Sequence, residues 1–266
     1  MSRPSPTTGP RRRLVAAVVV LLLVVAAGWW TIRSYDRTVP RCTAAALPAV
    51  ALSVDQADNA ATVAAVGLAE GMPHHAVTVA LATALQESGL RNLPDGDRDS
   101  AGLFQQRPSQ GWGTYAEVTD PVAASRAFYE RLRRVPDWET AEVTDAAQAV
   151  QRSAYPAAYA QWEPLARAVA VGLTGEEPAG LRCEGLDLRG PGGDVATLAR
   201  EELGTPRVSG PHPATRGWAR ASWLVAHAAR LGVDEVRYDG RTWTADSGTW
   251  SAAGPPDGTL SWEHAT

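Results

Sequence analysis

The chain has 266 residues and a formal net charge of −4, and all 25 of its basic residues are arginine. This length fits one or two domains with extensions. Residues 1–41 carry seven arginines and one aspartate, which leaves 18 arginines against 28 acidic residues in the remainder. That balance argues against long-range attraction to nucleic acid or to another anionic polymer, so an acidic polymer would have to bind in a shaped groove.

The N-terminal region predicts a membrane anchor. Residues 1–13 read as a cytoplasmic tail, and Leu14–Ile32 is an uncharged stretch that would span roughly 28 Å as a helix, enough for a bilayer core. Three arginines precede this stretch and favour a cytoplasmic N-terminus. We therefore expect a single-pass cell-membrane protein with extracellular C-terminal domains on the cell-wall side. The alternative is a cleaved signal peptide, with Ala26 and Gly28 as the small residues before the cut.

Two cysteines, Cys42 and Cys183, lie at the two ends of a predicted domain over residues 42–183. In an oxidising compartment two cysteines most simply pair with each other, and closing so long a loop is worth on the order of 5 kcal/mol. A lipid-modified Cys42 and an intermolecular bond are the alternatives. The residues before Cys42 lack the small-residue signal that lipidation needs.

Helical patterns dominate this predicted domain. An alanine-rich amphipathic helix is expected over Asp58–Glu70 and ends at Gly71. The next helix, His74–Glu87, is apolar nearly all round and therefore buried. Residues Leu90–Ser100 are rich in Asp and Gly and predict a loop or a short hairpin. Later helices are predicted at Pro121–Leu132 with Asp120 as its cap, at Asp145–Ser153 with Thr144 as its cap, and at Tyr155–Leu173.

The C-terminal part reads differently. A linker is expected over residues 184–193, followed by a small α+β module of unknown role over residues 194–266. Its predicted helices are Val195–Leu203 and Arg216–Leu231. Two short strands, Glu235–Tyr238 and Arg241–Ala245, are joined by Asp239-Gly240, which is a strong signal for a two-residue hairpin.

The most informative pattern is a glutamate at the end of the buried helix. Glu87 is followed at once by Ser88 and Gly89, and eighteen positions later comes Gln105. Cleaving a glycosidic bond requires an acid that is still protonated near neutral pH. Burial and the negative end of the helix dipole both raise the pKa of a carboxyl placed there. A solvated glutamate beside a glycine cap is the alternative interpretation.

The motifs Gln86–Gly89 and Ala101–Gln105 resemble those of the soluble lytic transglycosylase branch of the lysozyme superfamily. The segment Gln105–Gly113 is similar to a version found in actinobacterial membrane-anchored proteins. The resemblance covers about residues 58–170 and implies a mainly α, lysozyme-like α+β domain. It also implies cleavage of peptidoglycan glycan strands between N-acetylmuramic acid and N-acetylglucosamine by a single glutamate.

Roles follow from this resemblance. Glu87 would be the acid and then the base, Ser88 would help to orient the substrate, and Gly102, Leu103 and Gln105 would line the cleft. The family also carries an Ala-Tyr-Asn-Ala-Gly motif that this chain lacks, and Gln151 would stand in for its amide. Among the aromatic residues, Trp112 lies next to the motif and is the candidate for sugar stacking; the others are Tyr115, Trp138, Tyr159 and Trp162.

Several alternatives remain open. A hydrolase would need a second carboxylate, for which Asp97 and Asp99 are the candidates. The stretch Asp95–Asp99 imitates the start of a calcium loop but lacks its closing glutamate, and the His74-His75 pair has no further ligand at a suitable spacing, so we expect no metal and no cofactor. A non-catalytic peptidoglycan-binding or envelope-assembly protein is the alternative function. Protein partners are not predicted.

Overall fold

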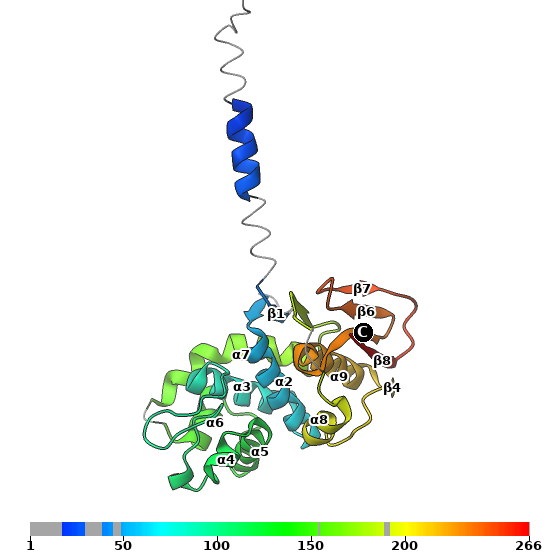
Figure 1. The fold of residues 1–266 in the computed structure, drawn as a ribbon. Helices are drawn as coiled ribbons and strands as arrows, with labels where there is room; N and C mark the ends of the chain where they lie inside the picture. Colours follow the sequence, from blue (N-terminus) through cyan, green and yellow to red (C-terminus); the bar gives the residue numbers. More distant parts are fainter. Residues whose placement is uncertain (1–17, 30–38, 45–48, 154, 189–191, 266) are drawn as a thin grey trace, which may run out of the picture. The chain divides into compact units, whose positions relative to one another are not determined.

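The computed structural model describes residues 18–29, 39–44, 49–153, 155–188 and 192–265. The chain divides into two units, Met1–Val39 and Pro40–Thr266, which are described separately. Figure 1 shows the fold.

In the first unit, the described residues 18–29 are helical. No helix in the described part of the chain is long and apolar enough to cross a membrane. The prediction of a transmembrane helix at Leu14–Ile32 is therefore corrected, and with it the predicted single-pass localisation. Residues 14–17 and 30–32 of that stretch lie outside the described residues.

The second unit combines helices with two antiparallel sheets in one compact body. The predicted fold class, a mainly α domain and a small α+β module after a transmembrane helix, is thus wrong in its membrane helix and in the strands that it left out. The helices of the described residues are α2 (Val54–Ala69), α3 (His74–Ser88), α4 (Tyr115–Val118), α5 (Pro121–Leu132), α6 (Val143–Gln151), α7 (Glu163–Leu173), α8 (Val195–Glu202), α9 (Ala214–Ala226) and α10 (Ala228–Leu231), with the 3-10 helices η1 (Pro108–Gln110) and η2 (Pro156–Trp162). The predicted boundary at residues 184–193 stays a prediction.

Two predicted helices are each divided. The helix expected over Tyr155–Leu173 consists of η2 and then α7, because Pro164 lacks the N–H that a continuous helix would need and instead sits in the first turn of α7. The helix expected over Arg216–Leu231 is α9 followed by α10, with the junction at His227. The other predicted helices are confirmed to within a few residues at their ends.

The smaller sheet combines strands that lie far apart in the sequence, whereas the larger sheet is formed within the C-terminal part of the chain. The smaller sheet has the strand order β2-β1-β3, and the larger has the order β4-β8-β5-β6-β7. Their bounds are β1 Arg41–Ala44, β2 Val50–Leu52, β3 Leu181–Glu184, β4 Gly210–Pro211, β5 Val233–Tyr238, β6 Arg241–Thr244, β7 Trp250–Ala252 and β8 Thr259–His264. The predicted hairpin is confirmed: β5 and β6 pair at Tyr238 and Arg241, and Asp239 and Gly240 both have positive φ, as a two-residue hairpin turn requires.

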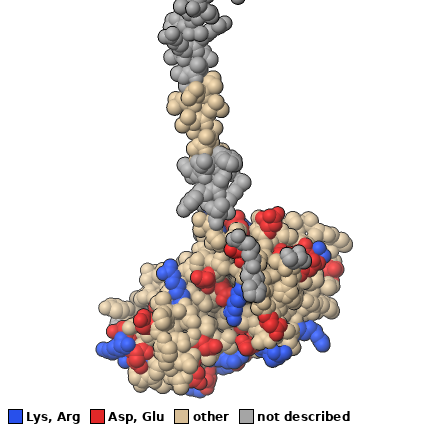
Figure 2. All heavy atoms as spheres, in the orientation of Figure 1, with Lys and Arg blue, Asp and Glu red and all other residues tan. Residues whose placement is uncertain are grey.

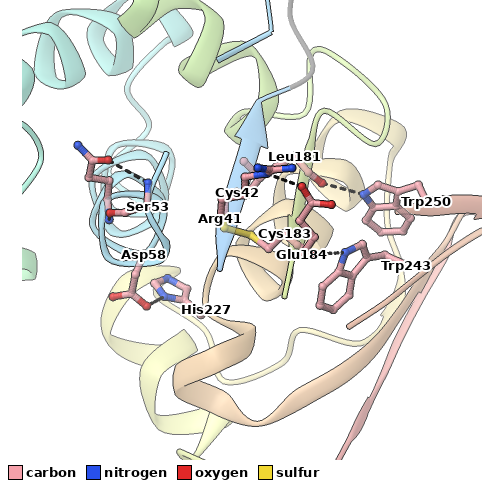
Figure 3. Close-up of a disulfide and its surroundings, with 11 residues drawn as sticks. Arg41, Cys42, Ser53, Asp58, Leu181, Cys183, Glu184, His227, Trp243 and Trp250 are labelled. Carbon is pink, nitrogen blue, oxygen red and sulfur yellow. Dashed lines mark hydrogen bonds and ion pairs between the residues drawn. A yellow bond between two sulfur atoms is a disulfide. The ribbon is translucent and has the colours of Figure 1, made fainter. Parts of the chain in front are cut away.

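The disulfide between Cys42 and Cys183 is confirmed. The two residues face each other in register on β1 and β3, so the bond joins the two ends of the segment between them. Two indole N–H groups from the larger sheet bind β3 (Figure 3): Trp243 donates to the carbonyl of Cys183 at 3.2 Å, and Trp250 donates to that of Leu181 at 2.8 Å. The cross-linked strands therefore also anchor the larger sheet.

Helix α2 lies at the centre of the second unit. It packs against α3, α5, α7, α8 and α9, and in Figure 1 α3 and α5 lie on one side of it and α9 on the other. Its buried residues are mostly alanine, which lets neighbouring helices approach closely. At Gly67 a Cβ atom would lie 2.6 Å from the hydroxyl of Tyr129, so only glycine leaves room for that side chain. The same hydroxyl donates to the carbonyl of Val63 at 3.0 Å.

A buried charge network joins α2 to the C-terminal helices. The fully buried ring of His227 lies between two carboxylates, with Nδ1 2.5 Å from Asp58 of α2 (Figure 3) and Nε2 3.0 Å from Glu202 of α8. The indole of Trp223 also donates to Glu202, at 2.7 Å. Arg230 lies 3.4 Å from Asp58 on the outer side of the network. The network therefore connects α2, α8 and the junction of α9 and α10.

The imidazole of this network is charged at neutral pH. Burial alone lowers the pKa of His227, but the adjacent charges of Glu202 and Asp58, with their hydrogen bonds, raise it from 6.5 to about 9. Burial raises the pKa of both carboxyls, yet the charge of His227 and its hydrogen bonds outweigh burial, so the pKa values of Asp58 and Glu202 lie below their usual range. A buried ion network of this kind is strongly destabilised when one member is removed.

A histidine whose folded pKa is raised contributes stability that is complete below its unfolded pKa and is lost as pH rises through its folded pKa. We therefore expect the free energy of unfolding to fall by on the order of 3 kcal/mol between pH 6.5 and pH 9.5. Urea unfolding at several pH values measures this. His227→Gln should lower stability at pH 6.5 and remove most of the pH dependence, whereas His264→Gln, at an exposed position, should change neither. A pH profile of His227→Gln that matches the wild type would contradict the assignment.

Candidate functional site

The site is built at the C-terminal end of α3. Residues 76–85 of this helix are all buried, so beyond them its last turn is where it can present a polar side chain. Gly89 ends the helix with φ 64°, and its N–H donates to the carbonyl of Leu85 at 3.0 Å. This bond is that of an αL cap, and the N–H of Leu90 also donates to the carbonyl of Ala84, at 3.1 Å. Glu87 thus sits in a helix end of fixed geometry.

The Glu87 carboxyl is largely shielded from solvent and engaged by two side chains. The hydroxyl of Tyr159 in η2 donates to Oε1 of Glu87 at 2.7 Å. Burial raises the pKa of Glu87, and the hydrogen bonds from Tyr159 and Gln151 lower it by less, so that the net direction is upward. Burial and the nearby Glu87 charge raise the pKa of Tyr159 in turn, which keeps its phenol protonated and a donor.

Gln151 connects Glu87 to the glycine-rich loop. It is the last residue of α6, and its side-chain Nε2 donates to the carbonyl of Phe104 at 2.8 Å. Its amide is also close enough to Glu87 to lower the pKa of that carboxyl. The structure therefore places Gln151 near Glu87. Gln86 is fixed on the other side of the helix end, because its Oε1 accepts from the indole of Trp162 at 2.8 Å.

Ser88 ties the helix end to the loop. Its hydroxyl lies 2.7 Å from the carbonyl of Leu103 and 3.0 Å from that of Ala84, and its oxygen accepts from the N–H of Arg91 at 3.2 Å. The hydroxyl is fully engaged within the protein. Its evident contribution is to hold the loop against α3.

The loop from Ala101 to Gln106 closes on itself. The backbones of Ala101 and Gln106 exchange hydrogen bonds at 3.1 Å, and the Leu103 side chain is completely buried in the core. The Gln105 amide donates to the carbonyl of Gly102 at 3.2 Å and accepts from the Ser100 hydroxyl at 3.0 Å. The structure thus uses Leu103 and Gln105 to build the loop, and the hydrogen bonds of Gln105 stay within it.

Trp112 is 8% exposed, and the guanidinium of Arg131 lies 3.4 Å from its ring centroid. That face of the ring is therefore covered by a cation–π contact. The aromatic side chain that the structure does bring to Glu87 is Tyr159. From the sequence, Tyr159 was named only among several aromatic residues, because no local pattern shows that a residue 72 positions further along the chain contacts Glu87.

The two aspartates considered as second carboxylates have different surroundings. Asp99 accepts from the backbone N–H of Ser109 at 2.7 Å, from Arg107 Nε at 2.8 Å and from the Ser109 hydroxyl at 2.9 Å. These bonds hold its pKa far below the usual range. Asp97 is exposed. Within the described residues, no group of three or more His, Cys, Asp or Glu side chains is arranged to hold a metal ion.

The site thus consists of one shielded carboxyl, a phenol donor, an amide and a loop carbonyl, supplied by α3, η2, α6 and the loop before η1. No model of a protein family matches the chain, and no curated protein matches it. The assignment of a function therefore depends on the chemistry of Glu87 and its neighbours.

Gly102 provides a test of how the loop is fixed. Its φ is 79°, and a Cβ atom there would lie 1.9 Å from the carbonyl oxygen of Val118. Gly111 also has positive φ, at 72°, but nothing lies near its Cβ position. We expect Gly111→Ala to cost about 1–2 kcal/mol from backbone strain alone, and Gly102→Ala about 2–5 kcal/mol because the loop must also move. Chemical unfolding of the two variants measures this, and equal losses would show that the Val118 contact is unimportant.

Proposed function

We propose that this protein cleaves peptidoglycan glycan strands between N-acetylmuramic acid and N-acetylglucosamine, using Glu87 as its single catalytic carboxyl in the manner of a lytic transglycosylase. The observation that carries this proposal is the environment of Glu87. Burial raises its pKa while Tyr159 and Gln151 fix its orientation. A carboxylic acid that stays protonated near neutral pH is what glycosidic bond cleavage requires.

The position of Tyr159 indicates which oxygen carries the proton. The phenol O–H occupies Oε1 of Glu87 at 2.7 Å, which leaves Oε2 to hold the transferable hydrogen. The C-terminal end of α3 adds to the effect, because the negative end of a helix dipole disfavours a second negative charge. Burial and the dipole therefore act on this carboxyl in the same direction.

The proposed reaction needs one carboxyl for two proton transfers. Protonated Glu87 donates its hydrogen to the bridging oxygen, and the bond between that oxygen and the muramyl C1 breaks. The C6 hydroxyl of the same muramyl residue then attacks C1, and its proton passes to the Glu87 carboxylate. The products are a shortened strand and a 1,6-anhydromuramyl end, and Glu87 is again protonated.

The state of Asp99 favours this outcome over hydrolysis. Direct hydrolysis commonly uses a second carboxylate to activate water or to stabilise the sugar. Asp99 already accepts three hydrogen bonds from Arg107 and Ser109, and its depressed pKa makes it a weak base. It is better suited to holding its own loop than to taking a proton.

One observation favours a second candidate function, a non-catalytic peptidoglycan-binding protein. The Gln105 amide and the Ser88 hydroxyl were both expected to contact sugar. In the structure the amide hydrogen-bonds Gly102 and Ser100, and the hydroxyl donates to the carbonyl of Leu103. A protein that keeps the carboxyl but recognises glycan without cutting it would fit these contacts.

Product analysis tests the proposal. Purified protein is incubated with peptidoglycan, and released fragments are identified by mass spectrometry. We expect 1,6-anhydromuramyl products from the wild type and a loss of about 10²–10⁴-fold in rate for Glu87→Gln, which keeps the shape but cannot transfer the proton. Glu139→Gln, at an exposed position, is the matched control and should retain full activity.

Three results would contradict the proposal. Products with only reducing ends would identify a hydrolase. Equal activity of wild type and Glu87→Gln would place the chemistry elsewhere. If wild type and variant both bind glycan and neither cleaves it, the protein is a binding protein.

A further inference from the structure

A cavity of about 300 Å³ lies beside α6 and has an unusual lining. Three arginines, Arg131, Arg134 and Arg152, line it together with Val135, Ala149 and Val150. No acidic side chain lines this cavity, which we call the arginine pocket. Over the face seen in Figure 2, by contrast, acidic and basic side chains are interspersed.

Two of the arginines come from α5 and its end, and one of them is held firmly. Arg131 stacks on the ring of Trp112 and donates to the carbonyl of Gly111 at 2.7 Å. Arg134 follows the end of α5 and pairs with Glu130 on the exposed face of that helix. Arg131 is thus held in place by Trp112 and Gly111, and it also belongs to the lining of the cavity.

Arg152 is the third member and has no ion pair or hydrogen bond from its side chain in the described part of the molecule. It ends α6 with φ 54°, a left-handed conformation that costs a non-glycine residue on the order of 1 kcal/mol. Burial lowers the pKa of Arg131, and the like charges of Arg152 and Arg134 lower it further. The three arginines therefore lie close enough to repel one another, and the charge of Glu130 offsets part of that repulsion.

We propose that the arginine pocket binds an oxyanion, a carboxylate or a phosphate, carried by the glycan that Glu87 acts on. This inference rests on the proposed function for the identity of that glycan. Planar guanidinium groups match the geometry of carboxylate and phosphate oxygens, and a bound anion would relieve the repulsion among the three cations.

The location fits a substrate subsite. Arg152 directly follows Gln151, whose amide donates to the carbonyl of Phe104 and lowers the pKa of Glu87. An anion held by Arg152 would thus be coupled to the candidate catalytic carboxyl through one residue of backbone. The protein as a whole has a net charge of −4, so it would select an acidic glycan by this local site and not by its overall field.

Binding is measured in the Glu87→Gln background, so that cleavage plays no part. Inorganic phosphate and acetate are titrated into ¹⁵N-labelled protein while the arginine Nε–H signals are followed. We expect saturable shifts, with affinity weakened about tenfold by Arg152→Gln and by Arg134→Gln. Arg241→Gln, at an exposed position on β6, is the matched control and should bind as the parent does. No saturable shift, or unchanged affinity in both pocket variants, would overturn the proposal.

Co-sedimentation with peptidoglycan distinguishes the two sources of the anion. Arg152→Gln should weaken binding to untreated sacculi. If the difference from the parent disappears after hydrofluoric acid removes phosphodiester-linked polymers, the ligand is a phosphate. If it disappears after the carboxyl groups of the sacculi are converted to neutral amides with a carbodiimide and ammonia, the ligand is a carboxylate. Equal binding of parent and variant to untreated sacculi would overturn the link to glycan, whereas failure of the cleavage assay with this Arg152 dependence intact would overturn only the proposed function.

Discussion

Helix α2 buries its small side chains against α3, α5, α7, α8 and α9, and this contact sets how these five helices are placed around it. Alanine and glycine allow the helices to approach closely, and the Gly67–Tyr129 contact shows how little space remains. Close approach has a consequence for α3. Residues 76–85 of this helix are buried, and the two polar side chains among them, Thr78 and Thr83, donate to backbone carbonyls of the same helix. A charged side chain in this stretch would be buried without partners, so the carboxyl of α3 lies at the end of the helix.

That constraint accounts for the character of Glu87. Glu87 lies in the last turn of α3, next to η2 and to the loop from Ala101 to Gln106. Its carboxyl is largely shielded from solvent but not fully buried. Tyr159, Gln151 and the Phe104 carbonyl supply the polar partners that a carboxyl needs there. The raised pKa is therefore a product of the helix packing and not of a charged neighbour. The opposite case is His227, whose pKa is raised because two carboxylates lie against it.

Sequence patterns predicted the parts of the fold that depend on neighbouring residues. The helices, the Asp239-Gly240 hairpin and the cysteine pair follow from periodicity, turn chemistry and simple pairing. The strands β1 and β3 were missed because they are short and pair across a long stretch of chain, a contact that no local pattern records. The membrane helix was predicted from the length of an uncharged run and from the arginines before it, and the described residues do not contain a helix long and apolar enough to span a membrane.

In the candidate site, too, some residues were predicted from the sequence and others were not. Glu87 and Gln151 were predicted and lie together, whereas Tyr159 and the His227 network depend on contacts between distant segments. Gln105 was predicted to contact the substrate from the family resemblance, and Trp112 from its position next to the motif in the sequence. In the structure the left-handed turn at Gln105, with φ 47°, returns its amide to its own loop, and Arg131 covers Trp112. Backbone conformation of this kind is decided by the packing around the loop.

The central claim is that burial keeps the Glu87 carboxyl protonated above the usual pH. The most direct test is a titration of the ¹³C-labelled glutamate carboxyl signals by NMR, with the Glu87 signal identified by its absence from Glu87→Gln. The account predicts a midpoint above the ordinary glutamate value of 4.5. A midpoint at or below that value would contradict it.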